Sequence, residues 1–118
     1  MIVAGFGLRA SATLAGLRTL LGEMQVDALA VVADKASHPA LIALAQDIAK
    51  PLLPIALVDL ARDRAQTPAP RQPHRYGNTS VAEAAALAAA GTTAVLTHPR
   101  ITAADGTATM AIAQGPDT

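Results

Sequence analysis

Two patterns of apolar residues take turns along the chain, one typical of strands and one typical of helices, and this order predicts an α/β fold. Mainly apolar stretches of strand length occur at 2–4, 28–33, 53–58, 94–97 and 107–113, and the run 28–33 is apolar throughout, which suits a strand covered on both faces. Other stretches repeat apolar residues every three or four positions, as helices do. These stretches predict helices that begin after a Ser11 or Thr13 cap, at Pro39 and after Ser80.

The order of these elements predicts how the sheet is built. Strands and helices alternate through the first half, which favours parallel strands covered by helices on both faces. The two closing strands are joined by a loop that holds His98, Pro99 and Arg100, so this pair can run antiparallel. Pro54 lacks a backbone N–H and places the third strand near a sheet edge. We therefore predict one domain over residues 1–118, a three-layer α/β/α sandwich with a mixed, mostly parallel sheet of about five strands.

The region before the last helix changes character. Residues 65–76 contain three prolines beside basic residues, which predicts a proline-rich loop. A short helix is expected just before it, over residues 59–64. Ser80 and Glu83 stand three positions apart at the start of the last helix, which is the spacing of a capping box.

Charge and composition exclude several classes of protein. Nine basic and nine acidic residues balance, which argues against a nucleic-acid protein that relies on bulk positive charge. Cysteine is absent from the sequence, so thiolate catalysis, disulfides and zinc–cysteine sites are excluded. The longest apolar runs are far shorter than the roughly 20 residues of a membrane span. Without a basic leader at the N-terminus, we expect a cytoplasmic protein with no membrane contact.

The first candidate site follows the first strand. Glycines at a strand end let the backbone approach a ligand, and a following helix presents unpaired N–H groups to an anion. The candidate ligand residues there are Gly5, Gly7, Arg9 and Ser11. The same segment fits the dinucleotide pattern G-x-G-x-x-A, with Asp34 at the distance expected of a ribose-binding acid. A tight strand–helix turn without any ligand also explains these glycines.

Two further segments supply candidate ligand residues. Lys35 follows the second strand, at the sheet edge where ligands collect in open α/β folds. The turn before the last helix adds Asn78, Thr79 and Ser80, whose small polar groups suit carboxylate or phosphate oxygens. A solvated loop lysine and an ordinary helix cap explain both segments without a ligand, and this alternative stays open.

Catalytic groups are sparse in this sequence. His38, His74 and His98 lack the spacing of metal ligands, so we expect neither a metal site nor a cofactor. The G-x-S-x-G elbow of serine hydrolases is missing, and each serine is first explained as a helix cap. For an enzyme, the catalytic candidates are Asp34 or His38 as a base and Arg9 or Lys35 as the group that stabilises an oxyanion.

Taken together, these segments resemble the cobalamin (vitamin B12) biosynthesis family formed by CobE and the C-terminal domain of CbiG. The resemblance spans residues 2–114, and its most specific segment is Gly77–Ala86. The matching segments are Gly5–Ser11, Ala33–Lys35, Pro39–Leu41, Gly77–Ala86 and Met110–Ala113. Many CbiG-type members carry cysteine where this chain has Leu8, and lysine near His98, which leaves the basic character of that loop to Arg100.

The resemblance implies a function in the aerobic route, because the chain looks like the stand-alone CobE form. The ligands of this family are corrin precursors, which are apolar macrocycles fringed with carboxylates. We therefore expect the chain to bind or carry a polycarboxylate corrinoid or precorrin intermediate, with the candidate ligand residues above and Arg100 as its anion contacts. Other enzymes of the pathway are implied as partners.

Three alternatives stay open. One is an enzyme of the same pathway, either a lactone hydrolase of the CbiG type or a helper of a precorrin methyltransferase. Another is a nicotinamide-binding half-domain, which rests only on Gly5, Gly7, Ala10 and Asp34. The last is a docking role for the proline-rich segment Gln66–Tyr76, which would bind a pathway enzyme.

Overall fold

A computed structural model describes residues 1–116 of the chain. Its strands are β1 (Ile2–Leu8), β2 (Ala28–Val32), β3 (Leu52–Ile55), β4 (Val95–Thr102) and β5 (Ala108–Gln114). Its helices are α1 (Leu14–Leu21), α2 (Pro39–Ile48) and α3 (Val81–Ala90). Three short 3₁₀ turns are η1 (Ala33–Lys35), η2 (Leu57–Asp59) and η3 (His74–Tyr76). In this part of the chain, no helix has the length and apolarity needed to cross a membrane.

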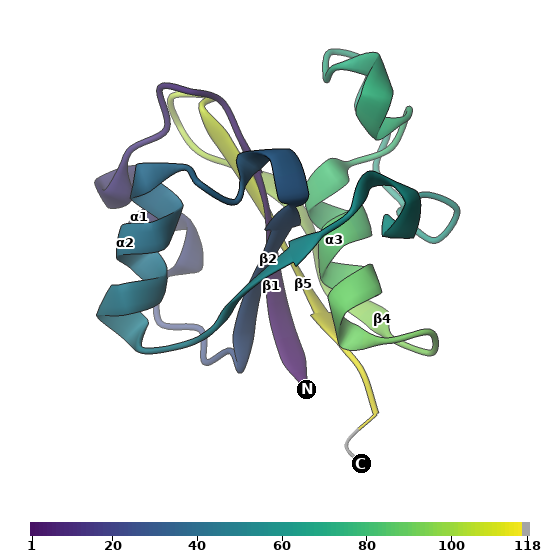
Figure 1. Ribbon diagram of the computed structural model, residues 1–118, viewed down its shortest axis with the longest axis horizontal. Coiled ribbons are helices and arrows are strands. Elements are labelled where there is room, and N and C mark those ends of the chain that lie inside the picture. The colour runs from purple at the N-terminus through teal and green to yellow at the C-terminus, as the bar shows by residue number, and fades with distance from the viewer. Residues whose placement is uncertain (117–118) are drawn as a thin grey trace.

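The five strands form one mixed sheet in the order β3-β2-β1-β5-β4. β1 pairs in parallel with β2, and β2 with β3, whereas β5 is antiparallel to both β1 and β4. Four strands therefore point the same way and only β5 is reversed. Helices α1 and α2 cover one face of the sheet and α3 covers the other, as Figure 1 shows. The predicted α/β/α sandwich with a mostly parallel sheet is confirmed, including the edge position of the proline-containing β3.

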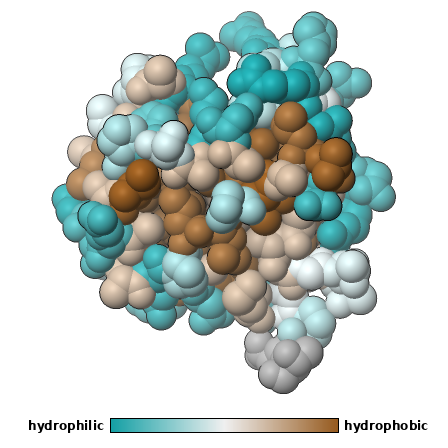
Figure 2. All heavy atoms as spheres, in the orientation of Figure 1, coloured by the Kyte–Doolittle hydropathy of each residue, from teal (hydrophilic) through white to brown (hydrophobic). Residues whose placement is uncertain are grey.

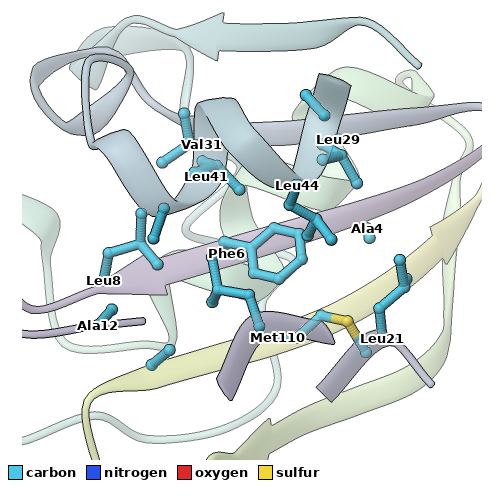
Figure 3. Packing of buried hydrophobic residues seen from close by; sticks show 14 of the residues in the cluster. Ala4, Phe6, Leu8, Ala12, Leu21, Leu29, Val31, Leu41, Leu44 and Met110 are labelled. Carbon is cyan, nitrogen blue, oxygen red and sulfur yellow. The ribbon is translucent and has the colours of Figure 1, made fainter. Parts of the chain in front are cut away.

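The two faces of the sheet are packed by different kinds of side chain. Under α1 and α2, the fully buried Phe6 lies among leucines and Met110 (Figure 3). On the opposite face α3 is alanine-rich and comes very close to β1. A Cβ added to Gly5 would overlap the carbonyl oxygen of Ala82 and lie 2.7 Å from the amide nitrogen of Ala86. Gly5 is therefore required by the close approach of a helix to a strand.

Three strand ends differ from the sequence-based prediction. β3 was expected to reach Val58, but it ends at Ile55 and the 3₁₀ turn η2 follows it. β1 was expected to end in the glycines, but it pairs with β5 along its whole length from Ile2 to Leu8. The glycines thus lie inside a strand, and the strand–turn–helix geometry of a dinucleotide fingerprint does not form there. β4 was expected to stop at Thr97, yet it continues through Pro99 to Thr102. Pro99 is tolerated because β4 is an edge strand with register shifts around His98.

The short helix expected at 59–64 is also absent, because a 3₁₀ turn ends at Asp59 and Leu60 is extended. The backbone N–H of Ala61 instead donates to the carbonyl oxygen of Ala84, 3.3 Å away in α3. This bond and the buried side chain of Leu60 attach the segment to α3, and only a single turn forms after Ala61, where the N–H groups of Arg64 and Ala65 donate to the Ala61 carbonyl oxygen.

Candidate functional site

A cleft of about 960 Å³ opens at the carboxyl-terminal ends of β1 and β2. This edge also receives the first residues of α3 and the turn between β4 and β5. The polar and charged residues of its lining are Arg9, Ser11, Lys35, Arg71, Gln72, Tyr76, Ser80, Arg100, Thr102, Thr107 and Thr109. Figure 2 shows hydrophilic residues over the upper part of one face of the molecule, where the proline-rich segment of Figure 1 lies. Ligands of open α/β sheets bind at this edge.

The cleft is positively charged although the chain as a whole is neutral. Four cationic side chains line it, and the lining contains no Asp or Glu within residues 1–116. The four are Arg9, Lys35, Arg71 and Arg100, and they come from four different segments of the fold. Three of them, Arg9, Lys35 and Arg71, make no side-chain hydrogen bond or ion pair with another described residue. The charge is thus available to a ligand.

The backbone around Arg9 holds this cation at the mouth of the cleft. Its N–H donates to the carbonyl oxygen of Thr107 over 2.8 Å, which joins the end of β1 to the start of β5. Its carbonyl oxygen lies 3.0 Å from Nε2 of His38. A carbonyl oxygen only accepts, so Nε2 carries the proton. Nδ1 of the same ring accepts from the N–H of Ala40 over 3.2 Å.

Both ring nitrogens of His38 are therefore committed to structure. The ring caps the start of α2 and fixes the loop that carries Arg9. His38 is not part of the cleft lining, although the sequence made it a candidate base.

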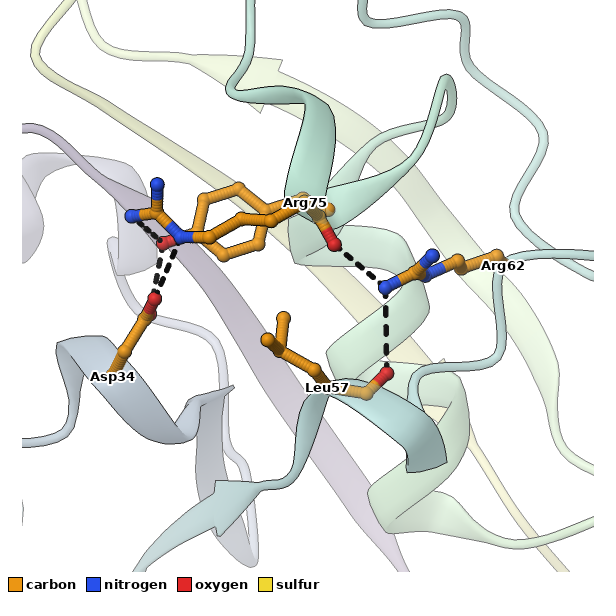
Figure 4. Close-up of polar contacts among 5 residues, drawn as sticks. Asp34, Leu57, Arg62 and Arg75 are labelled. Atoms are coloured by element: carbon orange, nitrogen blue, oxygen red, sulfur yellow. Dashed lines mark hydrogen bonds and ion pairs between the residues drawn. The ribbon is translucent and has the colours of Figure 1, made fainter.

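Asp34 likewise contacts protein groups and lies outside the lining (Figure 4). Its carboxylate accepts hydrogen bonds of 2.8 Å from the Nε of Arg75 and from the hydroxyl of Tyr76. Burial raises the pKa of Asp34, but the bonds from Tyr76 and Arg75 and the charges of Arg75 and Lys35 outweigh it and lower this pKa below its usual value. Arg62 donates to the carbonyl oxygen of Arg75 over 2.7 Å and extends the cluster. These contacts tie the proline-rich segment to the end of β2.

The turn before α3 is held in place by the side chains of Gln72 and Ser80. Gln72 donates to the carbonyl oxygens of Gly77 and Thr79, and its Oε1 accepts from the N–H of Val81 over 3.2 Å. Oγ of Ser80 accepts from the N–H of Glu83 over 3.2 Å. Two first-turn N–H groups of α3 are thus satisfied within the protein, and they are not aimed at a ligand.

Glu83 differs most from its predicted role. The capping box is only half formed, because the N–H of Ser80 donates to the carbonyl oxygen of Thr67 and not to Glu83. The carboxylate of Glu83 is 0% exposed. It accepts from the N–H and hydroxyl of Thr67 and from the N–H groups of Gln66 and Arg100, all within 2.8 Å. Burial raises the pKa of Glu83, but these four hydrogen bonds outweigh burial and lower it below the usual range.

The structure brings most of the predicted ligand residues to one cleft. The lining contains Gly7, Arg9, Ser11, Lys35, Ser80 and Arg100. Three predicted residues lie elsewhere. Gly5 is buried between β1 and α3, the carbonyl oxygen of Asn78 accepts from the N–H of Ala69, and Thr79 donates to the carbonyl oxygen of Arg62. Of the catalytic candidates, Arg9 and Lys35 line the cleft, whereas Asp34 and His38 do not.

The sequence-based reasoning missed six polar residues of the lining, which are Arg71, Gln72, Tyr76, Thr102, Thr107 and Thr109. Arg71, Gln72 and Tyr76 lie in the proline-rich segment, for which we predicted a loop and, as an alternative, a docking role, but no ligand contact. The local run of basic residues among the prolines was the available signal. Within residues 1–116, no group of three or more His, Asp or Glu is arranged to hold a metal ion.

Comparison with known proteins gives a consistent result. The family model for cobalamin synthesis G C-terminus matches residues 2–113. The crystal structure of CobE, a protein from the cobalamin (vitamin B12) biosynthetic pathway, is similar with a TM-score of 0.80 and 31% identity over 96% of this chain and 89% of that chain. The cobalamin biosynthesis protein chiG from Agrobacterium tumefaciens str. C58 is similar with a TM-score of 0.74 and 31% identity, over 99% of this chain and 100% of that chain. The search among curated proteins gives no match.

Proposed function

Because the chain belongs to the cobalamin synthesis G C-terminal family, and is thus a protein of cobalamin biosynthesis, we propose that its cleft binds a polycarboxylate corrinoid intermediate. The observation that carries this proposal is the set of four cations in one cleft whose described lining contains no Asp or Glu. Corrin precursors are apolar macrocycles with acetate and propionate groups around their rim. Their carboxylates are complementary to cations that come from separate walls.

The electrostatics favour a ligand with several negative charges. Unpaired cations that share a cleft repel one another, and an anionic ligand relieves that repulsion. Each carboxylate contact contributes about 1.5–3 kcal/mol where it is partly desolvated, and much less where it is exposed. Arg9 and Arg71 are exposed, whereas Lys35 and Arg100 are half-buried, so we expect the latter two to contribute more per contact.

The rest of the lining suits an apolar ring. Ala10 and Pro70 contribute exposed apolar surface, and the buried residues Leu8, Val32, Ala69 and Val81 complete the apolar part of the lining. A volume of about 960 Å³ lies at the upper end of the range of roughly 300–1,000 Å³ for small-molecule sites. A ligand with a broad apolar body and a charged rim matches this combination better than a compact anion such as inorganic phosphate.

We propose binding or carriage of the intermediate in preference to turnover. The lining offers several hydroxyl groups, but within residues 1–116 it contains no imidazole or carboxylate that would activate one as a nucleophile. The two predicted bases, Asp34 and His38, are engaged in hydrogen bonds outside the cleft.

A titration with a matched pair of ligands tests the proposal. Cobyrinic acid with cyanide on both axial positions of cobalt presents the carboxylate rim and cannot be ligated by a histidine. Its fully methyl-esterified form has the same ring without the charges. We expect the acid to bind at least tenfold more tightly than the ester, with an affinity that falls as salt rises. Equal affinities, or no binding of the acid, would contradict the proposal.

A further inference from the structure

The carboxylate of Glu83 joins three parts of the fold, namely the first turn of α3, the start of the proline-rich segment and β4. It projects from the first turn of α3, and its Oε1 accepts from the N–H groups of Gln66 and Thr67 over 2.7 and 2.8 Å. Its Oε2 accepts from the hydroxyl of Thr67 over 2.6 Å and from the N–H of Arg100 over 2.8 Å. No cation pairs with it in the described part of the chain, so four dipoles alone stabilise this buried charge.

The bond to Arg100 explains why this arginine reaches the cleft. β4 pairs with β5 at His98 and again at Ile101, and the register shifts between them. The N–H of Arg100 lies in this irregular stretch and donates to Glu83. The side chain of Arg100 lines the cleft, where its Nη1 donates to the carbonyl oxygen of Pro68 over 3.3 Å.

The bonds to Gln66 and Thr67 fix the opposite wall. These two residues lead directly into the lining segment that begins at Ala69 and includes Arg71. The N–H of Ser80 reinforces this anchor by donating to the carbonyl oxygen of Thr67 over 2.8 Å. The buried carboxylate of Glu83 therefore bonds to both of the segments that carry Arg71 and Arg100, in addition to the direct bond from Arg100 to Pro68.

From this geometry we infer that Glu83 is a positioning residue for anion recognition, which acts on a bound carboxylate through Arg100 without touching the ligand. This inference rests on the proposed function, since it concerns the same cleft. It also gives a functional reason for a carboxylate at this position. A glutamine would turn an NH₂ group toward two of the four donors and would lose the arrangement.

A double-mutant cycle separates positioning from a purely structural role. The affinity for dicyano-cobyrinic acid is measured for the wild type, Glu83→Gln, Arg100→Gln and the double variant, well below their unfolding midpoints. Arg100→Gln keeps the backbone N–H that donates to Glu83 and removes only the guanidinium. We expect Glu83→Gln to weaken binding about tenfold when Arg100 is present. In the Arg100→Gln background, we expect the same substitution to weaken binding by less than about threefold.

A milder pair covers the case in which Glu83→Gln does not fold. Thr67→Val removes the hydroxyl donor to Oε2, and Thr67→Ser keeps it. We expect Thr67→Val to weaken binding about threefold and Thr67→Ser to bind as the wild type does.

The outcomes distinguish this inference from the proposed function. The positioning role alone is overturned if the wild type binds the acid and Glu83→Gln weakens binding equally with and without Arg100. It is also overturned if the wild type binds the acid and Thr67→Val has no effect. A wild-type protein that does not bind the acid overturns the proposed function, and the inference with it.

Discussion

The hydroxyl group of Tyr76 donates a hydrogen bond to Oδ1 of Asp34 over 2.8 Å, across 42 positions of sequence. The guanidinium of Arg75 binds the other oxygen of the same carboxylate and lies over the Tyr76 ring, with Cζ 4.5 Å from the ring centroid. Tyr76 lines the cleft and is only 3% exposed, whereas Asp34 lies outside the lining. Asp34 therefore acts as the anchor of the cleft wall that carries Arg71.

Removing the Tyr76 hydroxyl tests this anchor. Tyr76→Phe keeps the buried ring and deletes both the donor to Asp34 and the acceptor for Nη2 of Arg75, so we expect a loss of about 0.5–1.5 kcal/mol in the free energy of unfolding. Urea denaturation measures that loss. Amide hydrogen exchange should also show faster opening of residues 68–76 than in the wild type. Unchanged exchange in this segment would show that the hydrogen bond does not hold the wall.

The stabilising effect of Glu83 should depend on pH. Its pKa in the folded protein is lowered from the ordinary value of 4.5, so the charged form favours folding. This stability is fully present above the unfolded-state pKa and is lost as the pH falls through the lower folded-state pKa. We expect Glu83→Gln to be less stable than the wild type by about 3 kcal/mol at neutral pH, with the difference shrinking at acid pH.

Urea denaturation of both proteins across this range measures the difference. Because Asp34 and Asp105, whose pKa values are also lowered, are present in both proteins, their titration cancels in the comparison. A difference that stays constant from neutral to acid pH would contradict the assignment of the stabilising effect to the ionised carboxylate.

The sequence was sufficient for most of the fold because its periodicities are strong. Apolar runs identified all five strands, and Pro39 and Ser80 marked the starts of two helices. Pro99 was misleading, because a proline in a strand predicts its end unless the strand is known to lie at an edge. The order of strands, which places β4 at the edge, is a tertiary property that the sequence of this strand does not carry.

The candidate site could be predicted only in part, for a similar reason. Arg9 and Lys35 follow strand ends, and the edge they share follows from parallel strand direction. Arg71 belongs to a segment without periodicity, and its place in the cleft depends on anchors at Asp34 and Glu83 that are remote in sequence. The spacing of Ser80 and Glu83 predicted a local capping box, but the carboxylate formed long-range bonds instead.

The close contact between β1 and α3 predicts that replacing Gly5 by alanine destabilises the protein strongly. In Gly5→Ala the new methyl group would overlap Ala82 and Ala86, both on a buried backbone that cannot move freely. We expect a loss of at least about 3 kcal/mol in the free energy of unfolding, or failure to fold. Thermal and urea denaturation measure this effect. A variant as stable as the wild type would show that α3 does not approach β1 this closely.

The two lysines of the chain form a matched test of the charged cleft. Lys35 is half-buried in the lining at the carboxyl-terminal ends of the strands. Lys50 is exposed and precedes β3, at the amino-terminal end of that strand. Lys35→Gln and Lys50→Gln remove the same charge from these two places. We expect the affinity for dicyano-cobyrinic acid to fall by about three- to tenfold in Lys35→Gln and to stay unchanged in Lys50→Gln. Equal losses in both variants would indicate attraction by overall charge alone.

Mapping the ligand on the protein by NMR tests the central claim most directly. Amide chemical shifts of the isotope-labelled chain are followed while dicyano-cobyrinic acid is added. The account predicts that the largest shifts occur at residues 7–11, 69–73 and 106–109 and at Arg100, the segments that line the cationic cleft. Shifts that are absent at saturating ligand, or that are confined to the opposite end of the sheet near Lys50, would contradict it.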